Sequence, residues 1–109
     1  MAEQSKVDME KGMEALELAK ASGKIRIGAN ETTKALERGT AKLVAIAKDV
    51  NPPEIIMHIP LLAKEKSIPC IEIPTKEELG NLVGLAIPTS AVAITEEGDA
   101  KKIIKELKA

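Results

Sequence analysis

The segment from Arg26 to Lys34 holds the side chains best suited to recognition chemistry. Gly28 can turn the chain into a following helix, whose free N–H groups and positive dipole end suit a phosphate. Asn30 and Glu31 then project from the first helical turn. An amide offers a donor and an acceptor whereas a carboxylate only accepts, so the pair could read the mixed hydrogen-bonding edge of a guanine. Lys34, one turn beyond Asn30, could meet a nucleic-acid backbone.

A purely structural interpretation of the same residues stands beside this one. Asn30 would cap the helix, Glu31 would stabilise its dipole, and Lys34 would be a solvated side chain. The residues of this segment alone leave both interpretations open.

The charge of the chain is balanced overall but uneven along the sequence. Sixteen basic residues nearly cancel 17 acidic ones, for a net charge of −1. Between positions 20 and 42 the only acidic residues are Glu31 and Glu37, against a larger set of basic ones: Lys20, Lys24, Arg26, Lys34, Arg38 and Lys42. Such a stretch is either an electrostatic footprint for an anionic partner or a solvated helix face.

Phe, Tyr and Trp are all absent from the chain. The core must therefore consist of aliphatic side chains and methionine. A mechanism that stacks a base on an aromatic ring is excluded, and so is an aromatic cage for a cation. We interpret the missing aromatics as a property of the core that leaves recognition chemistry unaffected.

Few residues are suited to catalysis or metal binding. His58 is the only histidine and lies in an apolar stretch, so we expect a structural role for it. Cys70 is the only cysteine, which precludes an internal disulfide, fits a reducing cytosol and, in an apolar run, predicts a buried, inert thiol. No metal-ligand spacing and no phosphate-binding loop motif occurs. We therefore expect no catalytic residue, no metal, no cofactor and no enzymatic activity.

Short apolar runs predict four strands that must position these residues. The expected strands are residues 24–27, 43–47, 70–73 and 91–94. The first alternates charged residues with isoleucine, and the second is apolar throughout. Because helices are expected before, between and after the strands, the pattern predicts an α/β fold.

Two helices are expected in the first third of the chain. Ser5 and Asp8 stand at capping-box spacing, and an apolar stripe then runs to a stop at Ser22-Gly23. Asn30 is expected to be the N-cap of the second helix, which ends before Gly39.

Three further helices follow. Asn51-Pro52-Pro53 is expected to open the third, which Pro60 must bend or split. Thr75 and Glu78 form a second capping-box pair, and Gly98-Asp99 starts the terminal helix. The whole chain, residues 1–109, is thus predicted to be a single three-layer α/β/α sandwich with a four-stranded mixed sheet. The charged amino-terminal stretch and the lack of a long apolar run predict a cytoplasmic protein without membrane contact.

Residues 28–39 read GANETTKALERG and resemble the signature of the archaeal kink-turn-binding ribosomal protein family. Similarity extends over roughly residues 14 to 107. The stretches that carry it are Ala41-Lys42-Leu43-Val44, Asp49-Val50, Pro52-Pro53-Glu54-Ile55, His58-Ile59-Pro60-Leu61-Leu62, Ile68-Pro69, Leu79-Gly80, Val83-Gly84 and Ala91-Val92-Ala93-Ile94.

This resemblance implies a non-catalytic α/β/α protein that binds and stabilises kink-turn RNA. Its expected partners are ribosomal RNA, box C/D or H/ACA guide RNA or ribonuclease P RNA, together with proteins of those ribonucleoprotein particles. We expect the free protein to be a monomer.

The resemblance also implies roles for individual residues. Asn30 and Glu31 would contact guanines of tandem sheared G·A pairs, and Gly28 and Ala29 would let the backbone approach the RNA. Phosphates would be met by Arg26, Lys34 and Arg38. Further RNA contacts would come from Asn51, Ile55 and Lys76. The loop that would cover a splayed-out bulge nucleotide consists of Leu85, Ala86, Ile87 and Pro88.

Several positions depart from the family pattern. Ile27 stands where a basic residue is usual, Ala86 replaces a polar residue, and Ile87 replaces an arginine of eukaryotic relatives. Cys70 and Glu72 occupy strand positions where aromatics are common. Ile27 and the apolar loop motivate an alternative hypothesis, namely a paralogue that binds a ribosome or a protein without selecting kink-turns.

Overall fold

The computed structural model describes residues 6–50 and 56–108, which form one mixed sheet between two layers of helices. The strands are β1 (Lys24–Ile27), β2 (Leu43–Ala47), β3 (Cys70–Ile73) and β4 (Ala91–Glu96). Their order across the sheet is β1-β4-β2-β3. All four predicted strands are confirmed, and β4 extends two residues beyond the predicted end.

Strand direction brings several chain segments to one edge of the sheet. β1 and β2 both run antiparallel to β4, and β3 runs parallel to β2. β1, β2 and β3 therefore all end at the edge where β4 begins, which we call the carboxyl edge. The segments after residues 27, 47 and 73 and the segment before residue 91 meet there.

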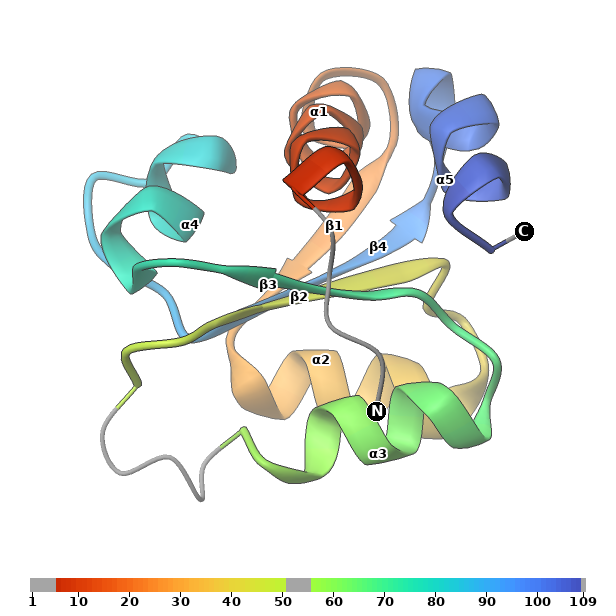
Figure 1. Cartoon of the computed structure of the whole chain (residues 1–109), viewed down its shortest axis with the longest axis horizontal. Helices are drawn as coiled ribbons and strands as arrows, with labels where there is room; N and C mark the ends of the chain where they lie inside the picture. Colours follow the sequence, from red (N-terminus) through yellow and green to blue (C-terminus); the bar gives the residue numbers. More distant parts are fainter. Residues whose placement is uncertain (1–5, 51–55, 109) are drawn as a thin grey trace.

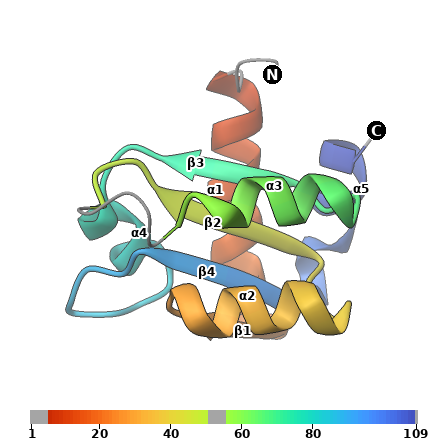
Figure 2. The same cartoon turned by 90° about the horizontal axis from the view of Figure 1, so that it is seen from below.

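Helices cover both faces of the sheet (Figure 1). One face carries α1 (Lys6–Ser22), α4 (Lys76–Leu82) and α5 (Lys101–Lys108), the last entered through a 3₁₀ turn at Gly98–Ala100. The other face carries α2 (Ala29–Arg38) and α3 (His58–Glu65), which Figure 2 shows side by side in front of the strands. The three-layer α/β/α sandwich is confirmed. No helix in the described ranges is both long and apolar enough to cross a bilayer.

The alternation of side chains along β2 divides the core into two halves. Leu43, Ala45 and Ala47 pack toward α1, α4 and α5, whereas Val44 and Ile46 pack toward α2 and α3. Because successive strand residues point to opposite faces, a fully apolar strand is what a sheet covered on both sides requires. Aliphatic side chains and alanine fill both halves.

The prediction of Asn30 as a helix N-cap is wrong. Helix α2 begins at Ala29, so the N-cap is Gly28 and Asn30 is the second helical residue. Gly28 has φ 102° and ψ 155°, a backbone conformation that is essentially restricted to glycine. This conformation turns the chain sharply out of β1, and the helix starts earlier than the side-chain signal indicated.

Pro60 does not interrupt the helix in which the structure places it. Helix α3 begins at His58, which places Pro60 in the first turn, where the N–H that proline lacks has no intrahelical partner to lose. The predicted helix start at Asn51-Pro52-Pro53 and the Ser5 cap lie outside the described residues.

The predicted helix boundaries at Ser22-Gly23, Gly39 and Thr75 are confirmed, whereas the α-helical part of the terminal helix begins at Lys101, after the 3₁₀ turn. Thr75 caps α4 by accepting a hydrogen bond from the backbone N–H of Glu78 at 3.1 Å. Gly39 ends α2 in the left-handed conformation, with φ 74° and ψ 17°.

Candidate nucleic-acid interface

The amino-terminal end of α2 is open to a ligand at the carboxyl edge of the sheet. No side chain caps the helix, because the N-cap residue is Gly28. The first N–H groups of an α-helix have no intrahelical partner and form its positive dipole end. The turn therefore presents backbone donors that suit an anionic or hydrogen-bond-accepting partner.

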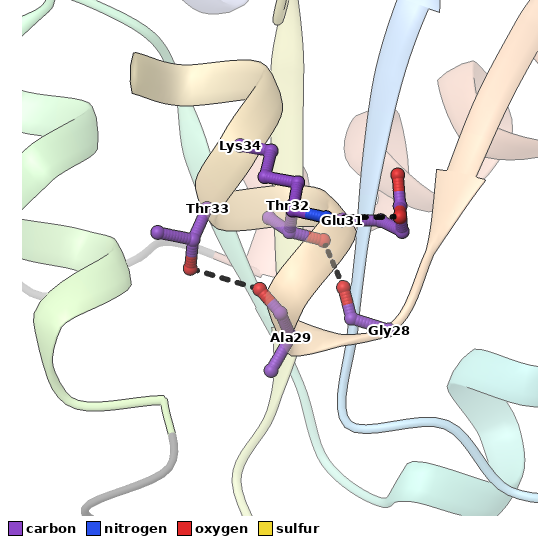
Figure 3. A network of polar contacts seen from close by, with 6 residues as sticks. All are labelled: Gly28, Ala29, Glu31, Thr32, Thr33 and Lys34. Atoms are coloured by element: carbon purple, nitrogen blue, oxygen red, sulfur yellow. Dashed lines mark hydrogen bonds and ion pairs between the residues drawn. The ribbon is translucent and has the colours of Figure 1, made fainter.

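The carbonyl groups of this turn, by contrast, are occupied from within the protein. The Gly28 carbonyl accepts from the Thr32 N–H at 3.0 Å and from the Thr32 hydroxyl at 2.8 Å. The Thr33 hydroxyl donates to the Ala29 carbonyl at 2.8 Å (Figure 3). The Gly28 N–H donates to the Ala91 carbonyl at 2.7 Å, which fastens the turn to the start of β4. The sheet and the two threonines thus hold the turn in place.

Asn30 and Glu31 are both exposed on this turn. The Asn30 side chain makes no hydrogen bond to any residue of the described ranges. A Glu31 carboxylate oxygen lies 3.9 Å from Nζ of Lys34 (Figure 3), and both side chains are about half exposed. A solvated ion pair of this length contributes little to stability, so both residues are available to a partner. The structure thus removes Asn30 from the capping role, whereas Glu31 in the first turn and the exposed Lys34 fit both interpretations.

A basic groove lies beside α2, where the helix packs near β1 and the end of β4. Its volume is about 340 Å³. It is lined by four cationic residues, two acidic residues and three others: Lys24, Arg26, Lys34, Arg38, Glu31, Glu96, Ala35, Thr40 and Thr95. Nζ of Lys24 lies 3.3 Å from a Glu96 carboxylate oxygen. Within the described part of the chain, Arg26 and Arg38 form no ion pair, so the groove carries uncompensated positive charge.

The groove includes residues that were not among the predicted RNA contacts. Lys24, Thr40 and Thr95 line it together with the predicted phosphate-binding residues. Lys24 and Arg26 are two residues apart on β1, a spacing that places both side chains on one face of a strand. This spacing could have predicted Lys24 as a further phosphate contact.

The basic stretch of the sequence does not form one patch. Lys20 lies on α1, on the opposite face of the sheet, in a hollow lined also by Glu78 and Asn81 of α4. Lys42 is exposed just before β2 and does not line the groove. The remaining four of the six basic residues converge on the groove.

The structure places the other predicted contacts around the carboxyl edge. Lys76 is the first residue of α4, and its N–H donates to Oδ1 of Asp49 at 2.7 Å. The following loop is fastened to α4 at both ends, since Leu85 N donates to the Gly80 carbonyl at 2.9 Å and Thr89 N to the Lys76 carbonyl at 3.1 Å. Asn51 and Ile55 lie outside the described residues.

The loop residues differ in what they offer to a ligand. Leu85 is half-buried and packs against the core under α1, α4 and α5. Ala86, Ile87 and Pro88 are exposed, and the Ile87 side chain is 68% exposed. The exposed part of the loop is therefore an apolar tip on an anchored base.

His58 is exposed, and Cys70, which was expected to be buried, is only partly so. Nε2 of His58 lies 2.6 Å from the Thr33 hydroxyl. Burial, and secondarily the charge of Glu72, raise the pKa of the Cys70 thiol to about 12, which keeps it protonated. Among the described residues no cluster of three His, Cys, Asp or Glu side chains could hold a metal ion.

The chain is similar to known proteins in sequence and in structure. The sequence model of the ribosomal protein L7Ae/L30e/S12e/Gadd45 family matches residues 10–104. The structure of the 15.5kD RNA binding protein of Giardia lamblia superposes with a TM-score of 0.86 at 28% sequence identity. The match covers 96% of this chain and 88% of that chain. The residues matched by the family model include α2 and its amino-terminal turn.

Proposed function

Because the chain belongs to the ribosomal protein L7Ae/L30e/S12e/Gadd45 family, we infer that it is a non-catalytic RNA-binding component of a ribonucleoprotein particle. The similar Giardia protein is itself described as RNA-binding. We further propose that the RNA is a kink-turn with tandem sheared G·A pairs, and that the α2 turn and the basic groove receive it. The particle would be the ribosome, a box C/D or H/ACA particle or ribonuclease P, in the cytoplasm.

The observation that carries this proposal is the uncapped turn of α2 beside the basic groove. The turn presents free N–H groups together with the exposed Asn30 and Glu31 side chains, and a carboxylate accepts from the N1–H and N2–H donors of a guanine. Arg26 and Arg38 offer charge that no described acidic residue neutralises. Base-reading groups and phosphate-binding groups therefore adjoin one another.

The mechanism would be selection of the bent RNA. A tight bend brings phosphates of both arms close together, and their repulsion disfavours it in the free RNA. Cations in the groove lower that repulsion, so the protein shifts the RNA population toward the bent conformer. Lys76 and the exposed tip at Ala86, Ile87 and Pro88 would contact the RNA beyond the G·A pairs, with the tip packing its aliphatic surface on an extruded base.

The experiment is a titration of a kink-turn RNA against the same RNA with its G·A pairs replaced by G·C. Both are measured at one salt concentration. A wrong base pair in a recognised site costs about 1–3 kcal/mol, and both pairs of the tandem are replaced, so we expect at least a tenfold preference for the kink-turn. Equal affinities would contradict the proposal.

Two substitutions separate base reading from phosphate binding. Glu31→Ala should reduce the preference between the two RNAs, whereas Lys34→Ala should weaken the binding of both by a similar factor. Glu37→Ala is the matched control, because Glu37 is exposed on the same helix and does not line the groove. An equal loss for both RNAs in Glu31→Ala would count against its guanine-reading role.

A second candidate function is a module that binds a ribosome or a protein without selecting kink-turns. It is favoured by the exposed apolar side chains of Ile27, 37% exposed, and Ile87, 68% exposed. Ile27→Arg and Ile87→Ala distinguish the two functions. The module is favoured if the wild type binds the kink-turn and G·C RNAs equally and these variants no longer capture ribosomal subunits.

A further inference from the structure

The first turn of α2 is connected to α3 by two hydrogen bonds that share one hydroxyl. The Thr33 hydroxyl lies 2.8 Å from the carbonyl oxygen of Ala29, the first residue of α2. The same hydroxyl lies 2.6 Å from Nε2 of His58, the first residue of α3. The two helices are neighbours on one face of the sheet (Figure 2), and this relay joins their amino-terminal turns.

The Thr33 hydroxyl has one proton, and this fixes which group donates in each of the two hydrogen bonds. A carbonyl oxygen only accepts, so the Thr33 hydroxyl donates its single proton to the Ala29 carbonyl. The hydroxyl oxygen then accepts from its other neighbour, and Nε2 of His58 must carry the proton that it donates.

The relay ends in the turn that carries the proposed RNA contacts. The turn has no capping side chain of its own, because its N-cap is glycine. The Thr32 and Thr33 hydroxyls donate hydrogen bonds to the carbonyl groups of the turn. Thr32 is fully buried and fixed by packing, whereas Thr33 is only half-buried. Packing therefore fixes the Thr33 hydroxyl less, and the contact from the exposed His58 is the hydrogen bond that reaches it from another element.

We propose that His58 is a positioning residue for RNA recognition. Its Nε2–H directs the Thr33 hydroxyl toward the Ala29 carbonyl, and this holds the first turn of α2 in the shape that presents Asn30 and Glu31. His58 acts through Thr33 and makes no RNA contact in this scheme. The inference rests on the proposed function, since it concerns how that surface is held.

The first test compares kink-turn RNA affinities of relay variants. Thr33→Val removes the hydroxyl at nearly constant shape, His58→Ala removes the donor, and His58→Gln offers an amide N–H at a similar reach. We expect about fivefold weaker binding in the first two, the effect of one hydrogen bond, and recovery of most of the affinity in His58→Gln. The double variant His58→Ala with Thr33→Val should bind no more weakly than either single variant, because both act through one relay.

The matched control is Leu61→Ala, an alanine substitution on the same helix at a side chain that is 70% exposed. It should leave RNA affinity unchanged. Unchanged affinity in Thr33→Val and His58→Ala would overturn the proposal, and so would losses that add in the double variant.

The second test needs no RNA. Nitrogen-15 NMR of the free protein in mildly alkaline solution reports which ring nitrogen of His58 carries the proton. We expect the Nε2–H tautomer in the wild type and a loss of that preference in Thr33→Val. An Nδ1–H tautomer in the wild type would overturn the relay. Equal binding of kink-turn and G·C RNA would count against the proposed function, while the tautomer would still decide the relay.

Discussion

At the scale of single residues, Gly28 sets the shape of the proposed RNA surface. Its φ of 102° and ψ of 155° lie in a region that side-chain-bearing residues essentially do not adopt. No atom lies within 4 Å of the position that a Cβ would occupy, so the requirement comes from the backbone and not from crowding. The same open space lets an RNA approach the turn closely.

Gly28→Ala is therefore expected to lower the free energy of unfolding by about 1–3 kcal/mol and to weaken RNA binding. Urea unfolding and RNA titration of the same sample measure the two effects. Gly39→Asn is the control, because Gly39 has the left-handed conformation that asparagine tolerates. An unfolding midpoint for Gly28→Ala equal to that of the wild type would contradict this account.

Cys70 makes stability depend on alkaline pH. Burial and the Glu72 charge raise its pKa from 9.0 to about 12 in the folded chain. Between these values the unfolded thiol has lost its proton while the folded one keeps it, so the unfolded state binds fewer protons and the free energy of unfolding falls as pH rises. Below about pH 9 this contribution is fully present.

Urea unfolding of the wild type and Cys70→Ala at several alkaline pH values tests this expectation. Lysines titrate in both proteins, so the informative quantity is the difference between the two curves. The wild type should lose stability with rising pH more steeply than the variant. Parallel curves would show that the thiol does not ionise differently in the folded and unfolded chains.

At the scale of elements, α4 organises one side of the carboxyl edge. It begins at the Thr75 cap, carries Lys76, and accepts both ends of the following loop through the carbonyls of Gly80 and Lys76. A helix this short depends on its cap, because isolated short helices are marginal in water. The cap therefore supports both Lys76 and the exposed loop tip.

Thr75→Ala is expected to lower the free energy of unfolding by about 1 kcal/mol, the usual effect of losing an N-cap. Thr75→Ser keeps the capping oxygen and should retain most of the stability. Chemical denaturation of the three proteins gives the comparison. If Thr75→Ala and Thr75→Ser unfold at the same midpoint, the cap does not stabilise α4.

At the scale of the whole molecule, a net charge of −1 coexists with a locally positive groove. Binding to RNA should therefore depend strongly on salt despite the acidic balance of the chain. If all four groove cations meet phosphates, the logarithm of affinity should fall against the logarithm of salt concentration with a slope of about −3, since each phosphate contact contributes about 0.7 to 0.9.

Replacing Arg26 and Arg38 together by alanine should make that slope shallower by about 1.5. Lys20→Ala with Lys42→Ala removes the same amount of charge from the same stretch of sequence but outside the groove. This pair should leave the slope close to that of the wild type. An equal change in both double variants would mean that overall charge, and not the groove, governs binding.

The aromatic-free composition belongs to the same scale. Both halves of the core are closed by leucine, isoleucine, valine and alanine, and the exposed turn of α2 needs no aromatic ring for hydrogen bonding. The hypothesis that the missing aromatics concern the core and leave recognition unaffected therefore stays consistent with the packing. Thermal unfolding and the RNA titration on one sample would separate the two properties.

Local sequence patterns predicted all four strands and the end of α2 at Gly39. They work because side-chain alternation and glycine conformations act over a few residues. They failed at Asn30, where a side-chain preference competed with the geometry of the adjoining turn. The N-cap is Gly28, two residues before the asparagine that the cap signal indicated.

The proposed recognition residues of α2 and the cations that line the groove were within reach of the sequence, because they all lie between positions 24 and 38. The enclosure of the groove by the end of β4 was not. Arg26 lines the groove together with Lys34 and Arg38. β1 pairs with β4, with Ile25 opposite Ile94, and the hydrogen bond from the Gly28 N–H to the Ala91 carbonyl fastens the start of α2 to β4. The same long-range pairing brings Lys24 to the groove and leaves Lys20 on the other side of the sheet. Thr95 and Glu96 join the groove only because β4 pairs with β1, and no short window of the chain contains both strands.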